Sequence, residues 1–449
     1  MKITVIGAGY VGLPSALVFA EYGNQVLCID VDEKKIAQLQ QGSSPIYEPG
    51  IEALLKRSLT AGRIQFSTKI SDASKDCDLF MICVGTPPSA QGDANLNYVW
   101  QAAENICQVI ENDCVVAIKS TVPVGTTRKL GLFLEDAIKA RKKNIKTAVA
   151  FTPEFLKQGR ALVDAQSPDR IVLGAEDPKV IELLETLYAP FQRKNDRTYV
   201  MSLESAEMTK YAANSMLASR ISLMNELAQI CDSYGADIES VREGIGADSR
   251  IGPAFLYAGI GYGGSCFPKD VKALIAMASS VGIEPYMLIA IDQRNEDQKS
   301  YLFRQIKKTL GSSLENKVFA LWGLSFKPET DDLRDAPSLI LIRHLLASGA
   351  SVLAYDPIAI ESAKKFMPEE WFSSGKVKIV DDQYKALVGA DAMILVTEWK
   401  QFRTPDFTKM KELMRGNYIF DGRNQYKKKQ VAKFGFNYLG VGRASFSSH

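Results

Sequence analysis

Short apolar runs alternate with helix-like segments over the first part of the chain. Residues 2–6 form a β-branched apolar run, and residues 13–22 follow a glycine-rich turn with helical character. Gly23 and Asn24 end that segment, and residues 25–29 form a second apolar run. Because parallel strands need a crossover connection, this order predicts a strand–helix–strand unit of a parallel sheet.

The same alternation continues to about residue 200. Further strand-like runs, separated by helical patterns, lie at 79–84, 115–118, 147–151 and 170–173. Such alternation implies a parallel sheet with its ligand-contacting loops at the carboxyl ends of the strands. Proline and threonine gather in three loops that follow these runs, at 85–88, 119–126 and 152–156.

The pattern changes to long helices after residue 200 and then returns to alternation. Helical spacing covers residues 203–235, and a second long helix is predicted at about 285–309. The final third again predicts strand, helix and strand, at 317–323, 338–346 and 351–356. We therefore expect an α/β protein with two doubly wound lobes, joined by a long central helical domain. The expected domain bounds are 1–200, 201–313 and 314–449.

Composition and charge fit a large enzyme in a reducing compartment. The 54 basic and 52 acidic residues nearly cancel, so no nucleic-acid or membrane surface is indicated. No apolar stretch predicts a membrane span, and we expect a cytoplasmic protein. The seven cysteines are scattered, several of them in apolar runs, which is typical of core residues. Their spacing indicates no zinc site, and we expect no metal.

A glycine fingerprint stands between the first strand and its helix. Gly7 would make the tight turn, Gly9 would let the backbone approach a pyrophosphate, and Gly12 would let the helix pack on the sheet. Asp30 ends the second strand, where a carboxylate accepts hydrogen bonds from a ribose diol and repels a 2′-phosphate. The sequence therefore predicts NAD as cofactor.

Residues 261–270 read Gly-Tyr-Gly-Gly-Ser-Cys-Phe-Pro-Lys-Asp. They place Cys266 in a glycine-rich turn beside Lys269 and Asp270. A cysteine attacks only as its thiolate, so it needs nearby positive charge or backbone N–H groups, and access for a substrate. Cys266 is the cysteine with these surroundings, and we expect it to be a nucleophile.

Histidine is nearly absent from the chain. His344 lies in an apolar helical segment, where a structural role is expected, and His449 is the last residue. A lysine, a carboxylate or an ordered water must then serve as general base. Lys210 and Asn214 stand four apart in the helix predicted at 203–235 and so share one helical face.

Taken together, these motifs resemble the UDP-glucose/GDP-mannose dehydrogenase family over essentially the whole chain. The resemblance implies two Rossmann-like lobes, an NAD-binding domain and a UDP-sugar-binding domain, which are joined by a central dimerisation and catalytic domain. Residues 246–252 and 266–274 look like the branch that acts on UDP-glucose. The matching motifs are Gly7-x-Gly9-x-x-Gly12, Ser120-Thr121-Val122-Pro123, Pro153-Glu154-Phe155-Leu156, Lys210-x-x-x-Asn214, Arg250-Ile251-Gly252, Gly263 to Asp270, Phe326-Lys327 and Asp421-Gly422-Arg423.

The resemblance implies oxidation of a sugar nucleotide's C6 alcohol to a carboxylate by two successive hydride transfers to NAD. Cys266 would attack the intermediate aldehyde, giving a thiohemiacetal and then a thioester. Lys210 would stabilise the developing oxyanion, and Asn214 would donate a hydrogen bond from the same face.

Three further residues would complete the implied chemistry. Asp270 would position water and balance the charge of Lys210. Glu154, helped by Thr121, would activate the water that hydrolyses the thioester. Many relatives have a glutamate where this chain has Gln158, and a glutamine could bind the cofactor ribose but could not take a proton.

The resemblance also implies the binding residues. Arg250 would reach in from a partner subunit, so we expect at least a homodimer. Besides the three glycines, the residues expected to bind NAD are Val11, Asp30, Lys35, Thr86, Thr121, Gln158, Lys269 and Arg334. Those expected to bind the UDP-sugar are Glu154, Phe155, Leu156, Lys210, Asn214, Arg250, Tyr257, Gly263, Lys327 and Arg423.

Three alternatives stay open at this point. The same machinery would act on GDP-mannose or on an N-acetylated UDP-hexosamine. A two-electron hydroxyacid dehydrogenase would release one NADH per substrate and would not need Cys266. A non-enzymatic nucleotide-binding protein is the third alternative.

Overall fold

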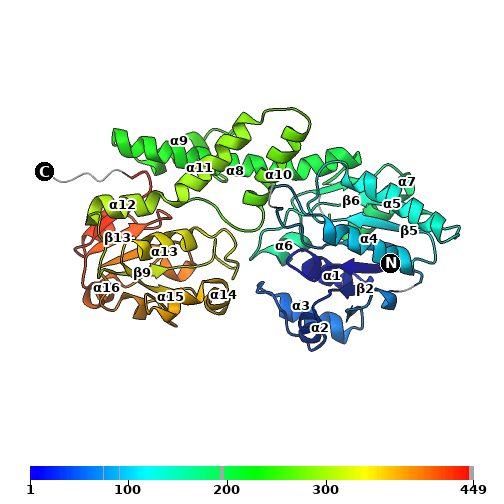
Figure 1. The fold of residues 1–449 in the computed structure, drawn as a ribbon, viewed down its shortest axis with the longest axis horizontal. Helices are drawn as coiled ribbons and strands as arrows, with labels where there is room; N and C mark the ends of the chain where they lie inside the picture. The colour runs from blue at the N-terminus through cyan, green and yellow to red at the C-terminus, as the bar shows by residue number, and fades with distance from the viewer. Residues whose placement is uncertain (74, 90–91, 193–196, 444–449) are drawn as a thin grey trace. The chain divides into compact units, whose positions relative to one another are not determined.

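The computed structural model describes residues 1–73, 75–89, 92–192 and 197–443 (Figure 1). The chain forms two compact units. The first unit comprises Met1–Ala213 and Ala276–Ile283, and the second comprises Asn214–Ile275 and Glu284–His449. Each unit is built around one β-sheet flanked by helices, as the α/β pattern of the sequence predicts.

The first unit contains an eight-stranded sheet in the order β3-β2-β1-β4-β5-β6-β7-β8. The strands from β3 to β6 pair in parallel, with β1 between β2 and β4, so the chain winds outward from β1 in both directions. The strands are β1 (Lys2–Ile6), β2 (Gln25–Ile29), β3 (Ile64–Ser67), β4 (Leu79–Ile82), β5 (Cys114–Ile118), β6 (Thr147–Phe151), β7 (Ile171–Gly174) and β8 (Thr198–Met201).

One strand direction differs from the sequence prediction. The run expected at 170–173 is present as β7, but β7 pairs antiparallel to β6, through Phe151 and Gly174. The fully described stretch 152–170 contains only the short helix α6 (Ala161–Gln166), which packs against α1. Without a long crossover helix after β6, the parallel arrangement does not continue to β7, whereas β8 is parallel to β7.

The helices of the first unit pack on this sheet and include the beginning of α8. The first of them is buried from Gly12 to Ala20, because it packs against β2, α3 and α6. These helices are α1 (Gly12–Glu21), α2 (Glu33–Gln40), α3 (Ile51–Thr60), α4 (Asn97–Val109), α5 (Thr126–Ala140), α6 and α7 (Pro178–Tyr188), with the 3₁₀ turns η1 (Ile70–Asp72) and η2 (Ala189–Phe191).

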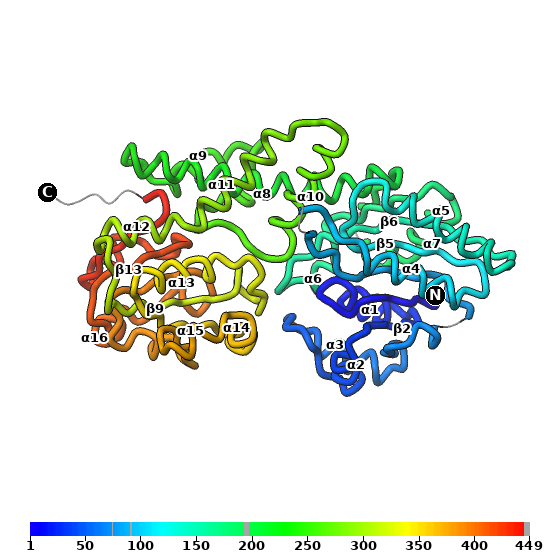
Figure 2. The backbone as a smooth tube through the Cα atoms, viewed as in Figure 1, coloured from blue at the N-terminus to red at the C-terminus, as the bar shows by residue number. Residues whose placement is uncertain are grey.

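The second unit contains a six-stranded, all-parallel sheet in the order β11-β10-β9-β12-β13-β14. Figure 2 shows the yellow strand β9 and the orange-red strand β13 in this sheet, where β12 separates them. Trp322, Phe319 and Phe420 are fully buried at its centre. The strands are β9 (Val318–Trp322), β10 (Ser351–Tyr355), β11 (Val377–Ile379), β12 (Ala392–Leu395), β13 (Tyr418–Asp421) and β14 (Asn437–Gly440).

The helix predicted at 203–235 is confirmed as the 32-residue α8 (Leu203–Tyr234). In the part of the chain that the structure describes, no helix is long and apolar enough to cross a membrane. The other helices are α9 (Ile238–Gly246), α10 (Phe267–Ser280), α11 (Tyr286–Lys299), α12 (Tyr301–Leu310), α13 (Pro337–Ala347), α14 (Ile360–Phe366), α15 (Glu369–Ser373), α16 (Phe407–Leu413) and α17 (Lys428–Ala432), with the 3₁₀ turns η3 (Lys385–Leu387) and η4 (Lys400–Phe402).

The stretch expected to be helical at 285–309 is helical, but it forms two helices, α11 and α12, and not one. Ser300 separates them, and its N–H bonds to the carbonyl of Asp297, three residues back, which tightens the end of α11. The hydroxyl of Ser300 lies 3.1 Å from Nε2 of His344, whose ring stacks on Phe303. His344 therefore packs at this break, which fits the structural role expected for it.

Glu207 connects α8 to the start of α5. Its carboxylate is buried and accepts hydrogen bonds from the backbone N–H of Gly125 at 2.5 Å and of Thr127 at 2.8 Å, and from the Thr127 hydroxyl at 2.6 Å. Burial raises the pKa of this carboxyl, although those hydrogen bonds oppose the rise. Glu207 thus acts as the N-terminal cap that α5 lacks in its own sequence.

Replacing Glu207 with alanine should loosen α5, because two buried N–H groups and a hydroxyl lose their acceptor. We expect a cost of about 3 kcal/mol, or about a hundredfold faster amide hydrogen exchange in α5. The matched control is Glu204→Ala, which removes a surface partner of Arg128 and should leave exchange within about twofold. Exchange in the Glu207 variant that equals that of the control would contradict this assignment.

Candidate active site

The turn after β1 has the geometry of a phosphate-binding turn. Gly7 has a φ of +106°, and a Cβ there would lie 2.6 Å from the carbonyl oxygen of Cys83. A Cβ on Gly12 would lie 1.8 Å from the carbonyl oxygen of Gly7, so no side chain fits. At Gly9, by contrast, no atom lies within 4 Å of the Cβ position, which leaves the backbone approachable where α1 begins. These residues therefore fit a dinucleotide pyrophosphate.

Asp30 lies beside this turn at the end of β2. Its carboxylate accepts hydrogen bonds from the backbone N–H of Ala8 at 2.9 Å and of Asp32 at 3.0 Å. The ammonium of Lys35 lies 3.8 Å away, and Val11 occupies the position just before α1. The structure thus brings Asp30, Lys35 and Val11 to the glycine turn, as expected for the cofactor-binding residues.

The loops after β4 and β5 meet at the same edge of the sheet. The hydroxyl of Thr86 donates to the carbonyl of Thr121 at 2.9 Å, and the hydroxyl of Ser120 donates to the carbonyl of Val84 at 2.6 Å. Both loops follow parallel strands, so their meeting at the carboxyl edge follows from the topology. Thr86 and Thr121 are therefore neighbours, as predicted.

A buried ion pair joins α8 to the loop after β6. Nζ of Lys210 donates to Oε1 of Glu154 at 3.0 Å and to the Glu154 carbonyl at 2.7 Å. The other carboxylate oxygen, Oε2, accepts the backbone N–H of Leu156 at 2.5 Å. Only 4% of the Lys210 side chain and 8% of the Glu154 side chain are exposed.

The environment of Glu154 keeps its carboxylate ionised. Burial alone raises the pKa of Glu154, but the charge and hydrogen bond of Lys210, the N–H of Leu156 and the charge of Lys119 together outweigh burial. The pKa therefore lies below its ordinary value, so Glu154 is a carboxylate at neutral pH. Phe155 lies in the same loop, with the guanidinium of Arg170 3.7 Å from its ring centroid.

Carboxylates that the sequence analysis missed hold the rest of this loop. Glu48, which is 4% exposed, accepts the backbone N–H of Gly159 at 2.8 Å and of Ala161 at 2.7 Å. Asp164 accepts the N–H of Lys157 at 3.0 Å. The loop carrying Gln158 is thus fixed on both sides of that residue. Glu48 stands more than a hundred positions before its partners, and no local pattern marks it.

In the second unit, Cys266 lies directly before α10. The N–H of Asp270 donates to the carbonyl of Cys266 at 2.8 Å, which closes the first turn of that helix. Cys266 is partly buried, and its Sγ lies 3.7 Å from the hydroxyl of Ser265. A helix N-terminus favours negative charge, so this position stabilises a thiolate.

Asp270 is 1% exposed and is held by two neighbours. Its carboxylate accepts a hydrogen bond from the side-chain amide of Asn214 at 2.6 Å and pairs with the ammonium of Lys269 at 2.5 Å. Asn214 comes from α8, one helical turn after Lys210. The structure thus brings Cys266, Asp270, Asn214 and Lys269 together at the start of α10.

The Cys266 turn packs closely against the loop after β9. A Cβ on Gly263 would lie 2.3 Å from the carbonyl oxygen of Asp335, and a Cβ on Gly264 would lie 2.7 Å from the Phe326 ring. The N–H of Gly264 donates to the carbonyl of Arg334 at 2.8 Å. Glycines at 263 and 264 therefore let the Cys266 turn approach this loop more closely than larger residues would allow. The loop also carries Lys327.

Arg423 and Tyr257 complete the expected residues of the second unit. Nε of Arg423 donates to the carbonyl of Val396 at 2.7 Å, and Nη2 lies 3.4 Å from the carbonyl of Phe326. The side chain of Tyr257 is 60% exposed. Arg250 is turned outward, with 87% of its side chain exposed, and pairs with Asp248 at 2.6 Å.

The expected site residues are divided between the two units. The first unit contributes the glycine turn, Asp30, Thr121, Glu154 and Lys210, and the second contributes the residues around Cys266.

Family models match the chain in three consecutive segments. They are described as the NAD binding, central and UDP binding domains of the UDP-glucose/GDP-mannose dehydrogenase family, and match residues 1–192, 204–297 and 320–428. The chain belongs to this family. The resemblance seen in the sequence is thereby confirmed, and so are its assignment as an NAD-dependent oxidoreductase and its expected cofactor, NAD.

Several members of the family are similar to the chain over its full length. A UDP-glucose 6-dehydrogenase of Pseudomonas aeruginosa is 46% identical, with 99% of this chain and 98% of that protein covered. One from Bacillus subtilis is 42% identical, with the same coverage. Among solved structures, a UDP-glucose dehydrogenase of Pyrobaculum islandicum gives a TM-score of 0.88 at 36% identity, covering 99% of this chain and 98% of that one. A UDP-D-ManNAc dehydrogenase of Pyrococcus horikoshii gives 0.84 at 29% identity, with 99% of each covered.

The position of Asp30 predicts which dinucleotide the family's NAD binding domain accepts here. We expect the protein to bind NADH at least about tenfold more tightly than NADPH, because the carboxylate repels a 2′-phosphate. Asp30→Asn should reduce the difference between the two dissociation constants. The asparagine amide oxygen can still accept the hydrogen bond from the Ala8 N–H. Fluorescence titration with both nucleotides measures the two dissociation constants. Asp32→Asn, at the cap of α2, is the control and should keep the ratio. Equal affinity of the unmodified protein for both nucleotides would overturn the assignment.

Proposed function

We propose that this protein oxidises UDP-glucose to UDP-glucuronate, with NAD as acceptor and Cys266 as covalent nucleophile. The observation that carries the proposal is the position of Cys266 before α10, beside the buried Asn214–Asp270 pair. A simple alcohol dehydrogenase needs no such cysteine, whereas an enzyme that must hold an aldehyde for a second oxidation does. The similarity to curated UDP-glucose 6-dehydrogenases over the whole chain supports the choice of UDP-glucose.

The proposed roles follow the three matched segments of the chain. The NAD-binding domain is placed at residues 1–200, the central catalytic and dimerisation domain at 201–313 and the UDP-sugar-binding domain at 314–449. A four-electron oxidation releases two hydrides, and two NAD molecules would accept them, one in each oxidation. The glycine turn, Asp30, Lys35, Thr86, Thr121 and Gln158 would hold NAD in the first unit, and Lys269 and Arg334 are assigned to it in the second.

The chain's own residues supply the covalent steps. The Cys266 thiolate attacks the C6 aldehyde and forms a C–S bond, while Lys210 stabilises the negative charge on oxygen and Asn214 donates a hydrogen bond to it. Oxidation of this thiohemiacetal gives a thioester. Water then adds to the thioester carbonyl, the C–S bond breaks, and Cys266 returns as a thiolate.

The hydrolytic water needs a base, and Glu154 is proposed to take its proton. Glu154 is ionised in the resting site, so it is already in the form that accepts a proton. Lys210 is its partner in the structure. When Glu154 takes the proton, the Lys210 ammonium would donate a hydrogen bond to the substrate oxygen. Thr121 and Asp270 would orient the water.

Binding of the UDP-sugar is assigned to the remaining expected residues. Backbone groups of Phe155 and Leu156, the side chains of Tyr257, Lys327 and Arg423, and the close backbone of Gly263 would surround it. Arg250 is exposed and turned outward within its own unit, which suits a residue that contacts the sugar nucleotide of a second copy. We therefore propose a homodimer as the smallest active assembly.

Turnover of purified sugar nucleotides tests the substrate. UDP-glucose should have the highest kcat/KM among UDP-glucose, GDP-mannose, UDP-N-acetylglucosamine and UDP-N-acetylmannosamine. Faster turnover of an N-acetylated sugar nucleotide would favour the second candidate function, oxidation of an N-acetylated UDP-hexosamine. The similarity to the UDP-D-ManNAc dehydrogenase of Pyrococcus horikoshii is the observation that favours this candidate. Absence of NADH with every sugar nucleotide would refute the proposal.

Replacing Cys266 with serine should stop the reaction after the aldehyde stage. A hydroxyl has a far higher pKa than a thiol and is a poor nucleophile in this position. We expect UDP-glucuronate formation to fall at least about a thousandfold, while the dissociation constant for UDP-glucose stays within about twofold. Cys107→Ala, at a buried cysteine in α4, controls for loss of a core thiol. A serine variant with near wild-type product formation would exclude the covalent route.

Replacing Glu154 with glutamine should accumulate the thioester. Glutamine keeps the shape and can still accept a hydrogen bond from Lys210, but it cannot take a proton from water. We expect a burst of about two NADH per active site, slow turnover afterwards, and a mass increase on the peptide that carries Cys266. Asp169→Asn, at an exposed acid in the same region, should show no burst.

The hydrolysis step of the wild type should also be insensitive to Glu154 titration at neutral pH. Since its pKa is lowered, the carboxylate persists as pH falls and is lost only below the ordinary glutamate value of 4.5.

A burst without an adduct on the Cys266 peptide, or unimpaired steady turnover of Glu154→Gln, would move the base role to another group.

A further inference from the structure

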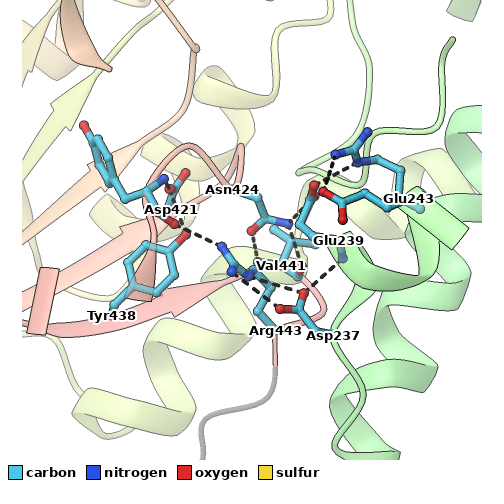
Figure 3. Close-up of polar contacts among 10 residues, drawn as sticks. Asp237, Glu239, Glu243, Asp421, Asn424, Tyr438, Val441 and Arg443 are labelled. Atoms are coloured by element: carbon cyan, nitrogen blue, oxygen red, sulfur yellow. Dashed lines mark hydrogen bonds and ion pairs between the residues drawn. The ribbon is translucent and has the colours of Figure 1, made fainter. Parts of the chain in front are cut away.

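A polar network in the second unit joins the start of α9 to the turn after β13 (Figure 3). Asn424 follows Arg423 in that turn and has a φ of +54°. Its side-chain amide donates to the carbonyl of Val441 at 2.8 Å, and its amide oxygen accepts the Val441 N–H at 2.8 Å. This pair of bonds imitates one rung of a β-ladder. The turn that carries Arg423 is thereby attached to the chain after β14.

The same turn is held from its other side by Asp421. One oxygen of this fully buried carboxylate accepts the N–H of Arg423 at 3.0 Å, and the other accepts the Tyr438 hydroxyl at 2.9 Å. Arg443 donates to the carbonyl of Tyr426 at 3.0 Å and lies 3.4 Å from Asp237, the cap of α9. Figure 3 shows Asp237, Arg443 and Asn424 together between the two segments.

Glu239 continues this network toward Tyr257. Its Oε1 lies 3.5 Å from the amide nitrogen of Asn424, and its Oε2 accepts a hydrogen bond from Nε of Arg242 at 2.8 Å. The guanidinium of Arg242 lies 5.1 Å from the ring centroid of Tyr257, within range of a cation–π interaction. The Arg242 and Glu239 side chains are only 19% and 24% exposed.

Tyr257 needs such support because 60% of it is exposed. An exposed aromatic ring reorients rapidly unless a neighbour restrains it. Arg242 can restrain it only while its own flexible side chain is held, and the short hydrogen bond to Glu239 does so. Glu239 thus lies between two residues that, under the proposed function, contact the UDP-sugar: Tyr257 through Arg242, and Arg423 through Asn424.

We propose that Glu239 is a positioning residue for UDP-sugar binding, which holds Arg242 against Tyr257 and braces the turn that carries Arg423. The inference rests on the proposed function. Glu239 touches neither the sugar nucleotide nor the reacting atoms. It acts by keeping two binding side chains in place before the ligand arrives, so it should affect binding rather than the chemical steps.

The first test compares two glutamates of one helix. Glu239→Gln should raise KM for the sugar nucleotide about fivefold, with kcat and the KM for NAD within about twofold. Glu243→Gln is the matched control. Glu243 stands one turn later, lies 3.7 Å from the same Arg242, and is 75% exposed, so its removal should change neither constant. An unchanged KM in Glu239→Gln, or an equal rise in both variants, would overturn the proposal.

A double-mutant cycle separates positioning from a general loss of stability. If Glu239 acts mainly through Tyr257, then Glu239→Gln should change KM less than about twofold in a Tyr257→Ala background. A fivefold rise in KM that persists in the Tyr257→Ala background would overturn the proposal that Glu239 positions the Tyr257 ring. The cycle should use the sugar nucleotide that the wild type turns over best. Failure of UDP-glucose in the substrate comparison would then refute the proposed function, while the KM ratios measured with the preferred sugar nucleotide would still decide the role of Glu239.

Discussion

The buried ion pair between Lys210 and Glu154 fixes the loop after β6 in the first unit. Taking both charges out of water costs several kcal/mol each, and only close pairing with additional hydrogen bonds offsets that cost. The structure supplies these bonds through the Glu154 carbonyl and the Leu156 N–H. The loop after β6 is therefore fixed to α8 by the two groups that the proposed chemistry uses. Removing the Glu154 carboxylate leaves the Lys210 charge uncompensated, so glutamine, whose amide oxygen can still accept the Lys210 hydrogen bond, is a milder replacement there than alanine.

The two units stabilise their buried carboxylates, Glu154 and Asp270, in different ways. In the first, a cation neutralises Glu154 directly and lowers its pKa against the effect of burial. In the second, the Asp270 carboxylate accepts a hydrogen bond from the Asn214 amide and pairs with the Lys269 ammonium. Cys266 lies at the N-terminus of α10. The first arrangement keeps the Glu154 carboxylate ionised. The second favours a thiolate while the acid beside it stays compensated.

Patterns within short stretches of the chain predicted much of this structure. The strand, glycine turn and helix at Gly12, and the glycine-rich turn at Cys266, are encoded by neighbouring residues, so the sequence identified them. The break at Ser300 was missed because both flanking stretches are helical, and the contacts of Ser300 with His344 come from distant packing. Glu48 and Glu239 were missed because their roles depend on partners far away in the chain, at Gly159 and Asn424.

The central claim of the proposed function is that two oxidations take place on each sugar nucleotide before the product leaves the protein. The number of NADH molecules formed per UDP-glucose consumed tests this claim most directly. With limiting UDP-glucose and excess NAD, the reaction run to completion should yield two NADH and one UDP-glucuronate for each UDP-glucose. A ratio of one NADH per substrate, with an aldehyde or ketone as the final product, would contradict it.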